Sequence, residues 1–172
     1  MNTRSFKRGS FIAAASIAMS LTAAAHAHQN HPKPTKQPRL NPVAILELEA
    51  ARRASASFHD VDRAVEAGYV DIGLFIPNMG WHYLKADLLD GRFDATKPEL
   101  LVYADDPCGG KRRLVAVEYA IPLDLSKRAP RGFSGRADTW VVNNDFQLWT
   151  LHAWVWEYNP EGVFAPTNVR VQ

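Results

Sequence analysis

Three polar side chains, His82, Glu118 and His152, stand in stretches of the sequence that are otherwise apolar. A carboxylate in the middle of an apolar strand is costly to bury unless it is paired. Two neutral imidazoles and one carboxylate on neighbouring strands would offset that cost together by holding a divalent metal ion. This donor set suits zinc in a hydrolytic site or iron in an oxygen-using site. The sequence therefore predicts a metal site with these three residues as its ligands.

The residue types around such a site indicate how it would work as an enzyme. Glu118 would act as a ligand or as a general base, and Tyr83 or Tyr119 would donate a proton. The three predicted ligands are far apart in the sequence, and it is an assumed sheet that brings them together. The alternative is that each histidine is an ordinary core or rim residue and that Glu118 pairs with an arginine.

Tryptophans gather in the same segments and support a second hypothesis. Their rings offer a large apolar area with a polar tip, which suits a pocket for a small apolar or aromatic ligand. Under this hypothesis the protein is a non-catalytic binder, and the contacts come from Trp81, Trp149, Trp154 and Trp156. Two alternatives stand beside it: the rings fill the gap between a helix and a sheet, or the chain is a structural or interacting protein of the cell envelope.

The fold expected to position these residues begins with one long helix at residues 43–67. Its apolar positions recur every three or four residues, and its charged residues fall mainly between them. Asn41 and Pro42 supply the start signal, and Gly68 supplies the stop signal.

After Gly68, short extended runs alternate with turn residues. The runs are rich in β-branched and aromatic residues, which favours strands. They span residues 69–76, 81–84, 99–104, 112–121, 140–143 and 147–158, and the two runs around the loop at 105–110 predict a hairpin. We expect an α+β domain in which the helix packs on an antiparallel sheet of about five strands.

Alternation along the run at residues 112–121 predicts which side chains share a face of the sheet. It places Leu114 and Ala116 on the side of Glu118, and it turns Val115 to the opposite side. The carboxylate would then lie among small and aliphatic neighbours, where it needs a partner.

The N-terminus reads as a cleavable signal peptide at residues 1–27. A basic head precedes an uncharged apolar run at residues 11–25, and small residues stand where a signal peptidase would cut after Ala27. That run is shorter than the roughly 20 residues that a membrane span needs, so a retained anchor is the less favoured alternative. We expect a periplasmic or secreted protein.

The segment that follows the predicted cleavage site is rich in proline and poor in large apolar side chains. Residues 28–42 are therefore expected to form a disordered tail, because nothing there could offset the entropy of folding. The rest, residues 43–172, has the size of a single domain.

Charge narrows the range of partners. Cleavage would remove three basic residues and no acid, which takes the formal net charge from +2 to −1. A nearly neutral chain gives no electrostatic argument for nucleic acid or for an anionic membrane. We expect a small-molecule ligand, no nucleic acid, and no stable membrane anchor after cleavage; the sequence leaves the oligomeric state open.

Two further groups were considered as sites. Cys108 is the one cysteine of the chain, and the basic residues at 111–113 would lower the pKa of its thiol, although a loop thiol without a role is favoured. Cleavage after Ala27 would expose His28, whose amine and ring could chelate copper together with His31, but a proline-rich tail does not preorganise such a site.

Several motifs resemble a family of small secreted bacterial proteins of unknown activity. They are Pro77-Asn78-Met79-Gly80-Trp81-His82-Tyr83, Leu114-Val115-Ala116-Val117-Glu118-Tyr119 and Leu151-His152-Ala153-Trp154, followed by Asn159-Pro160. This resemblance covers roughly residues 43–168 and implies one exported domain. A weaker pattern of short pieces resembles the plant oil-body-associated protein family, and it implies that His82, Glu118 and His152 are the positions to substitute first.

Overall fold

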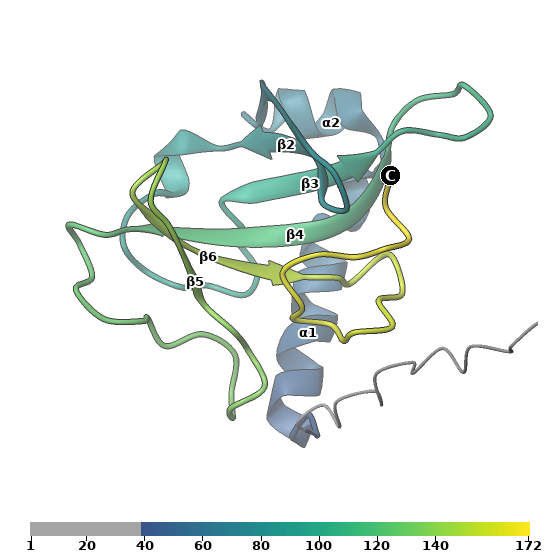
Figure 1. Ribbon diagram of the computed structural model, residues 1–172. Helices are drawn as coiled ribbons and strands as arrows, with labels where there is room; N and C mark the ends of the chain where they lie inside the picture. Colours follow the sequence, from purple (N-terminus) through teal and green to yellow (C-terminus); the bar gives the residue numbers. More distant parts are fainter. Residues whose placement is uncertain (1–38) are drawn as a thin grey trace, which may run out of the picture. The chain divides into compact units, whose positions relative to one another are not determined.

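The computed structural model describes residues 39–172 (Figure 1). The predicted signal peptide and residues 28–38 of the predicted tail lie outside the described residues. The last residues before the domain are described: Leu40 packs against the core, and the Asn41 side chain accepts the backbone N–H of Ala44. Within the described range, no helix has both the length and the apolar character that crossing a membrane requires.

The predicted helix at residues 43–67 is present, but it is interrupted. Helix α1, Pro42–Ser55, continues into a 3₁₀ turn, Ala56–His59, and a separate short helix α2, Val61–Glu66, follows. Asp60 separates the two, because its backbone is extended and its side chain accepts the N–H of Asp62. A residue that caps a new helix leaves the path of the preceding one. The predicted helix at 43–67 is therefore interrupted at residues 56–60, while its two ends lie close to the predicted ones.

The α+β class is confirmed, and the antiparallel sheet has six strands rather than about five. The strands are β1 Val70–Ile76, β2 Gly80–Leu84, β3 Leu100–Ala104, β4 Arg113–Pro122, β5 Val141–Asn143 and β6 Leu148–Ala153. Their order in the sheet is β1-β2-β3-β4-β6-β5, and every neighbouring pair is antiparallel. A short 3₁₀ turn η2, Ala86–Leu88, follows β2.

Strand β6 is shorter than the predicted run at residues 147–158. Its pairing with β4 ends where Ala153 lies opposite Val117. Beyond that point the N–H of Trp154 bonds to the carbonyl of Val163, and the N–H groups of Trp156 and Glu157 both bond to the carbonyl of Val115. The aromatic residues after 153 thus belong to a loop, although their residue types favour a strand.

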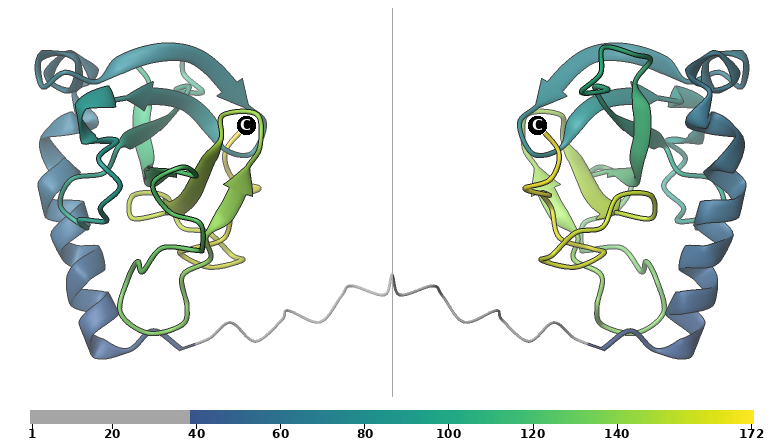
Figure 2. Two further views of the ribbon diagram at one scale, coloured as in Figure 1. Left: turned by 90° about the vertical axis from the view of Figure 1, so that its left-hand side faces the viewer. Right: turned by 90° about the vertical axis from the view of Figure 1, so that its right-hand side faces the viewer.

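The two faces of the sheet are covered differently. One face packs on α1, where Leu48 and Ala51 meet Leu101 and Val117 in the larger core cluster. The opposite face, which we call the inner face, carries a smaller buried cluster: Val102, Ala104, Val115, Ala116, Trp154 and the C-terminal Val171. Figure 2 shows the curled sheet with α1 along one side and the C-terminal segment at the other.

A β-bulge shifts the alternation in β4. Val102 lies opposite Ala116, whereas the next residue, Tyr103, lies opposite Leu114, so β4 has one extra residue there. Leu114 consequently packs in the core against α1, and Val115 joins Ala116 on the inner face. An inserted residue reverses the side of everything before it, which corrects the predicted sides of Leu114 and Val115.

Candidate metal centre

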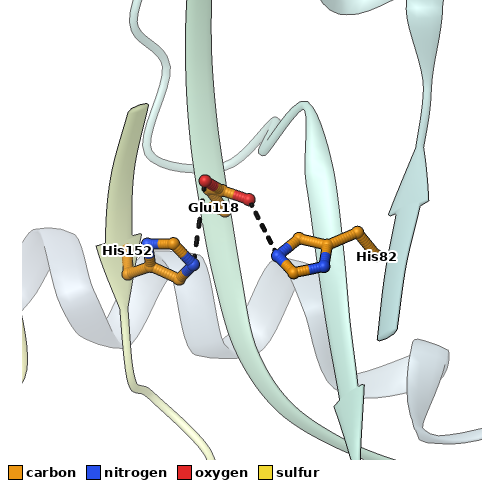
Figure 3. Close-up of side chains that lie close together, drawn as sticks. All are labelled: His82, Glu118 and His152. Carbon is orange, nitrogen blue, oxygen red and sulfur yellow. Dashed lines mark ion pairs between the residues drawn. The ribbon is translucent and has the colours of Figure 1, made fainter. Parts of the chain in front are cut away.

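His82, Glu118 and His152 meet on the inner face, as the sequence predicted (Figure 3). Each offers a nitrogen or an oxygen atom, and these atoms all lie within 4.8 Å of one another. His82 Nε2 is 3.5 Å from Glu118 Oε2, and His152 Nε2 is 3.7 Å from Glu118 Oε1. All three residues are buried, with exposed fractions of 2%, 5% and 3%.

The register of the sheet brings Glu118 and His152 together, and the curvature of the sheet brings His82 to them. Glu118 on β4 lies directly opposite His152 on β6, so these two side chains share a face as cross-strand neighbours. His82 is on β2, with β3 between it and β4. Strands two apart are separated by roughly 9.6 Å in a flat sheet. The side chains of His82 and Glu118 therefore reach one another because the sheet curls toward the inner face.

Gly80 allows β2 to lie close enough to β3 for this arrangement. Its φ is +115°, and a Cβ at this position would collide with the backbone carbonyl oxygen of Tyr103. Glycine is the residue that tolerates both the left-handed backbone and the close approach of another strand. His82 follows two positions later in the same strand.

The ring of His82 is oriented by a backbone group. Its Nδ1 lies 3.2 Å from the carbonyl oxygen of Leu74 on β1. In the tautomer that carries its proton on Nδ1, the ring donates to this carbonyl and presents the lone pair of Nε2 to Glu118. Metal-bound histidines are commonly oriented by such a hydrogen bond from the ring nitrogen that does not bind the metal.

His152 presents a buried nitrogen without a hydrogen bond. Its Nε2 has no hydrogen-bond partner among the described residues. The ring stacks on Trp154, with centroids 5.8 Å apart and an interplanar angle of 14°, and the Trp154 indole is held by donation to the carbonyl of Ala165. Burial lowers the pKa of His152 to about 4, so the imidazole is neutral at neutral pH. In the tautomer that carries its proton on Nδ1, Nε2 of this neutral ring offers a free lone pair, as a metal ligand must.

Glu118 lies between the two imidazole rings, and its surroundings shift the pKa of its carboxyl group. Burial raises the pKa of its carboxyl group, while the charge interaction with His82 and a hydrogen bond from Thr150 oppose that shift. The distances of 3.5 and 3.7 Å to the histidines are longer than ordinary hydrogen bonds. Two ligands of a tetrahedral ion bound at 2.0–2.1 Å are about 3.4 Å apart. The two carboxylate–imidazole distances are close to that spacing, and the group could hold a metal ion.

A hollow of about 360 Å³ opens beside this group. Thr150 and His152 of β6 form part of its lining, and the rest comes from Thr139, from β5 and its following turn, from Met79 and from Pro166. The hollow brings open space to the His152 side of the cluster.

The structure does not bring Tyr83 and Tyr119 to the cluster. Both pack in the core on the α1 face, opposite the histidines. The Tyr83 hydroxyl accepts from Arg112, and the Tyr119 hydroxyl donates to the carbonyl of Ala95. Neither tyrosine can reach the carboxylate through the sheet, so we do not retain them as proton donors.

The four tryptophans do not line a common pocket. The Trp81 indole donates to Asp105, Trp149 to the carbonyl of Ser126, and Trp156 to the hydroxyl of Ser55, all away from the inner face. Trp154 alone of the four contacts the cluster, through its stacking on His152. The four tryptophans therefore do not converge on one place in the described residues, and a ligand pocket lined by them stays a prediction.

A second buried glutamate, Glu99, escaped the sequence analysis. It is 2% exposed and accepts the backbone N–H of Ala120. Burial raises its pKa to about 8, and Asp90 and Asp94 add to the shift. The reasoning that selected Glu118, a carboxylate beside an apolar strand, would have found it. It lies at a different hollow, on the α1 face, and is not part of the metal group.

Glu99 makes a pH-dependent contribution to stability that glutamine would remove. The pKa of its carboxyl is about 4.5 in the unfolded chain and about 8 in the fold. The native state therefore holds a proton that the unfolded chain has lost, and stability falls as pH rises from about 4.5 to about 8. We expect Glu99→Gln to be more stable than wild type above pH 8 by ~2–4 kcal/mol. Urea unfolding of the metal-free proteins at pH 5 and pH 9 measures the difference in free energy of unfolding between the variant and the wild type. The same difference at both pH values would contradict the prediction.

Cys108 and His59, the histidine at the end of the 3₁₀ turn after α1, lie outside the metal group. Cys108 is exposed in the loop between β3 and β4. His59 packs edge-on against Trp156, with ring centroids 4.2 Å apart. Neither belongs to the metal group, which makes His59 a useful control for it.

Comparison with known proteins gives no assignment for this arrangement. The resemblances to secreted bacterial proteins and to oil-body-associated proteins stay predictions. No protein-family model, no curated protein and no solved structure matches the chain.

Proposed function

We propose that this protein binds one divalent transition-metal ion, Zn²⁺ or Fe²⁺, through His82, Glu118 and His152. The observation that carries the proposal is the convergence of three buried donor atoms within 4.8 Å, one of them a nitrogen with no hydrogen-bond partner among the described residues. Leaving buried polar groups unpaired costs free energy that an ion would recover.

The donor set favours this class of metal. Imidazole nitrogen suits zinc and iron, whereas Ca²⁺ and Mg²⁺ take oxygen ligands. Three protein ligands leave at least one coordination position open, which is typical of catalytic sites and unlike closed structural sites. An ion with an open position and a hollow beside it can activate water or polarise a bound group. We therefore place Glu118 as a ligand and the centre as the reactive part of an enzyme.

The proposal includes a place of action outside the cytoplasm. A basic head, an uncharged apolar run and a cleavage signal after Ala27 support export to the periplasm or the medium. The lone cysteine agrees with stability based on packing, which an exported domain of this size can achieve without disulfides. The expected partner is a small molecule, and the nearly neutral net charge after cleavage gives no electrostatic argument for nucleic acid.

Elemental analysis of the purified protein tests the proposal. The chain should be produced without a histidine tag, in medium containing trace metals, and analysed by inductively coupled plasma mass spectrometry. We expect about one equivalent of zinc or iron in the wild type and less than about a tenth of that in His152→Ala. His59→Ala, a histidine outside the cluster, should retain the wild-type content. Metal absent from the wild type, together with a melting temperature that added Zn²⁺ or Fe²⁺ leaves unchanged, would refute the proposal.

A further inference from the structure

We propose that the hollow beside His152 is the substrate site of this metal centre and that it admits small molecules without negative charge. This inference rests on the proposed metal centre. The hollow has a volume of about 360 Å³. Small-molecule sites commonly measure roughly 300–1,000 Å³, so it would hold a compact molecule of a few carbon atoms with its polar groups.

The hollow meets the metal group at His152, the one proposed ligand among its lining residues. His152 lines it directly, and Thr150, two residues earlier in β6, lines it from the same side of the strand. His82 does not line it, and that side of the group is closed by β1, where Leu74 contacts the ring. A molecule in the hollow would therefore approach the ion from the side of His152.

The charge of the lining indicates which molecules fit. Among the described residues that line the hollow there is no lysine or arginine, and Asp145 contributes a carboxylate. A phosphate or carboxylate group would find no cationic side chain there and would be repelled by Asp145, whereas an amide, ester or alcohol would not. The proposed metal ion would supply the positive charge that the lining residues lack.

The remaining lining is mixed, as expected for a small molecule with one polar end. Thr139 and Asn144 offer a hydroxyl and an amide as hydrogen-bonding groups. The apolar part comes from Met79, Val141, Val142 and Pro166. Such a surface orients an uncharged molecule by a few hydrogen bonds and buries its aliphatic part.

Two nearly isosteric probes test the charge preference on the loaded protein. Each variant is first given one equivalent of Co²⁺, whose visible absorption bands change when a new ligand binds. The probes are 4-propylimidazole, which is mainly uncharged at pH 8, and 3-(imidazol-4-yl)propionate, which carries a carboxylate on the same metal-binding ring. We expect 4-propylimidazole to bind saturably and the propionate to bind at least about tenfold more weakly, a difference that Asp145→Asn should reduce.

A substitution that fills the hollow tests the location. Val142→Trp should weaken the binding of 4-propylimidazole at least about tenfold, with Thr139→Trp as the second variant if the first does not fold. Val65→Trp is the control, because Val65 is 54% exposed on α2, away from the hollow. If Co²⁺ binds but the filled variants respond like the control, or if both probes bind equally, the substrate-site proposal is overturned and the metal proposal stands. If Co²⁺ does not bind to the wild type, the metal proposal itself fails.

Discussion

Glu118→Gln is expected to lower metal affinity at least about 100-fold while leaving the metal-free protein at least as stable as the wild type. Changes in the residues that merely orient ligands cost 10–100-fold, so the loss of a ligand should cost more. Glutamine keeps the shape of the side chain and removes a buried acid whose pKa is raised by burial. Zinc at about a thousand times its Kd should stabilise the wild type by ~4 kcal/mol and should not stabilise the variant. Isothermal titration and thermal unfolding, each with and without zinc, measure both effects.

Glu99→Gln is the matched control for this experiment. It makes the same chemical change at another buried glutamate whose pKa is raised, on the opposite face of the sheet. We expect this variant to bind zinc with wild-type affinity. A Glu118→Gln protein that keeps its zinc affinity, or one that unfolds without metal while Glu99→Gln does not, would mean that Glu118 has a structural role and is not a ligand.

Gly80→Ala is expected to destabilise the fold by about 2–4 kcal/mol and to weaken metal binding. The alanine Cβ would meet the carbonyl oxygen of Tyr103, a backbone atom that cannot rotate away, and the φ of +115° adds strain. Relief of the collision requires β2 to move away from β3, which carries His82 away from Glu118. Urea unfolding gives the first effect, and zinc titration under conditions where the variant is folded gives the second.

Gly73→Ala separates the backbone strain from the collision. Gly73 also has a positive φ, +68°, in the neighbouring strand β1, but a Cβ there would meet nothing within 4 Å. We expect this control to lose about 1 kcal/mol and to keep its zinc affinity. Equal costs at the two glycines would show that the close approach of β2 to β3 is unimportant.

The sequence was sufficient to find the three polar residues of the site and the class of fold. His82, Glu118 and His152 were recognisable because each interrupts an apolar strand, and the burial of all three follows from that pattern. The helix start at Asn41 and the stop at Gly68 are also confirmed. Asn41 caps α1 with its side chain, and Gly68 takes a positive φ, which are both properties of the local residue type.

The alternation of side chains along a strand also speaks against Tyr83 and Tyr119 as proton donors at this site. Tyr83 and Tyr119 were selected because they are next to His82 and Glu118 in the sequence, yet neighbours in a strand point to opposite faces. The structure places both against α1 accordingly. Trp154, two residues after His152, shares its side and is the aromatic residue that contacts it.

Other features depend on tertiary structure and could not be derived from one sequence. The bulge that turns Leu114 toward α1 arises from the pairing of β3 with β4, which local residue types do not encode. The approach of His82 to Glu118 across β3 depends on the curl of the whole sheet. The hollow is assembled from β5, β6, Met79 and Pro166, segments that come together when the C-terminal segment folds back.

Anomalous X-ray diffraction at the zinc absorption edge, from crystals of the protein grown with Zn²⁺, tests the metal centre most directly. The account predicts one strong anomalous peak at about 2.0–2.2 Å from the Nε2 atoms of His82 and His152 and from a carboxylate oxygen of Glu118. If these three side chains lie together as described but no peak stands between them, or if zinc occupies only the surface, the three residues do not form a metal centre.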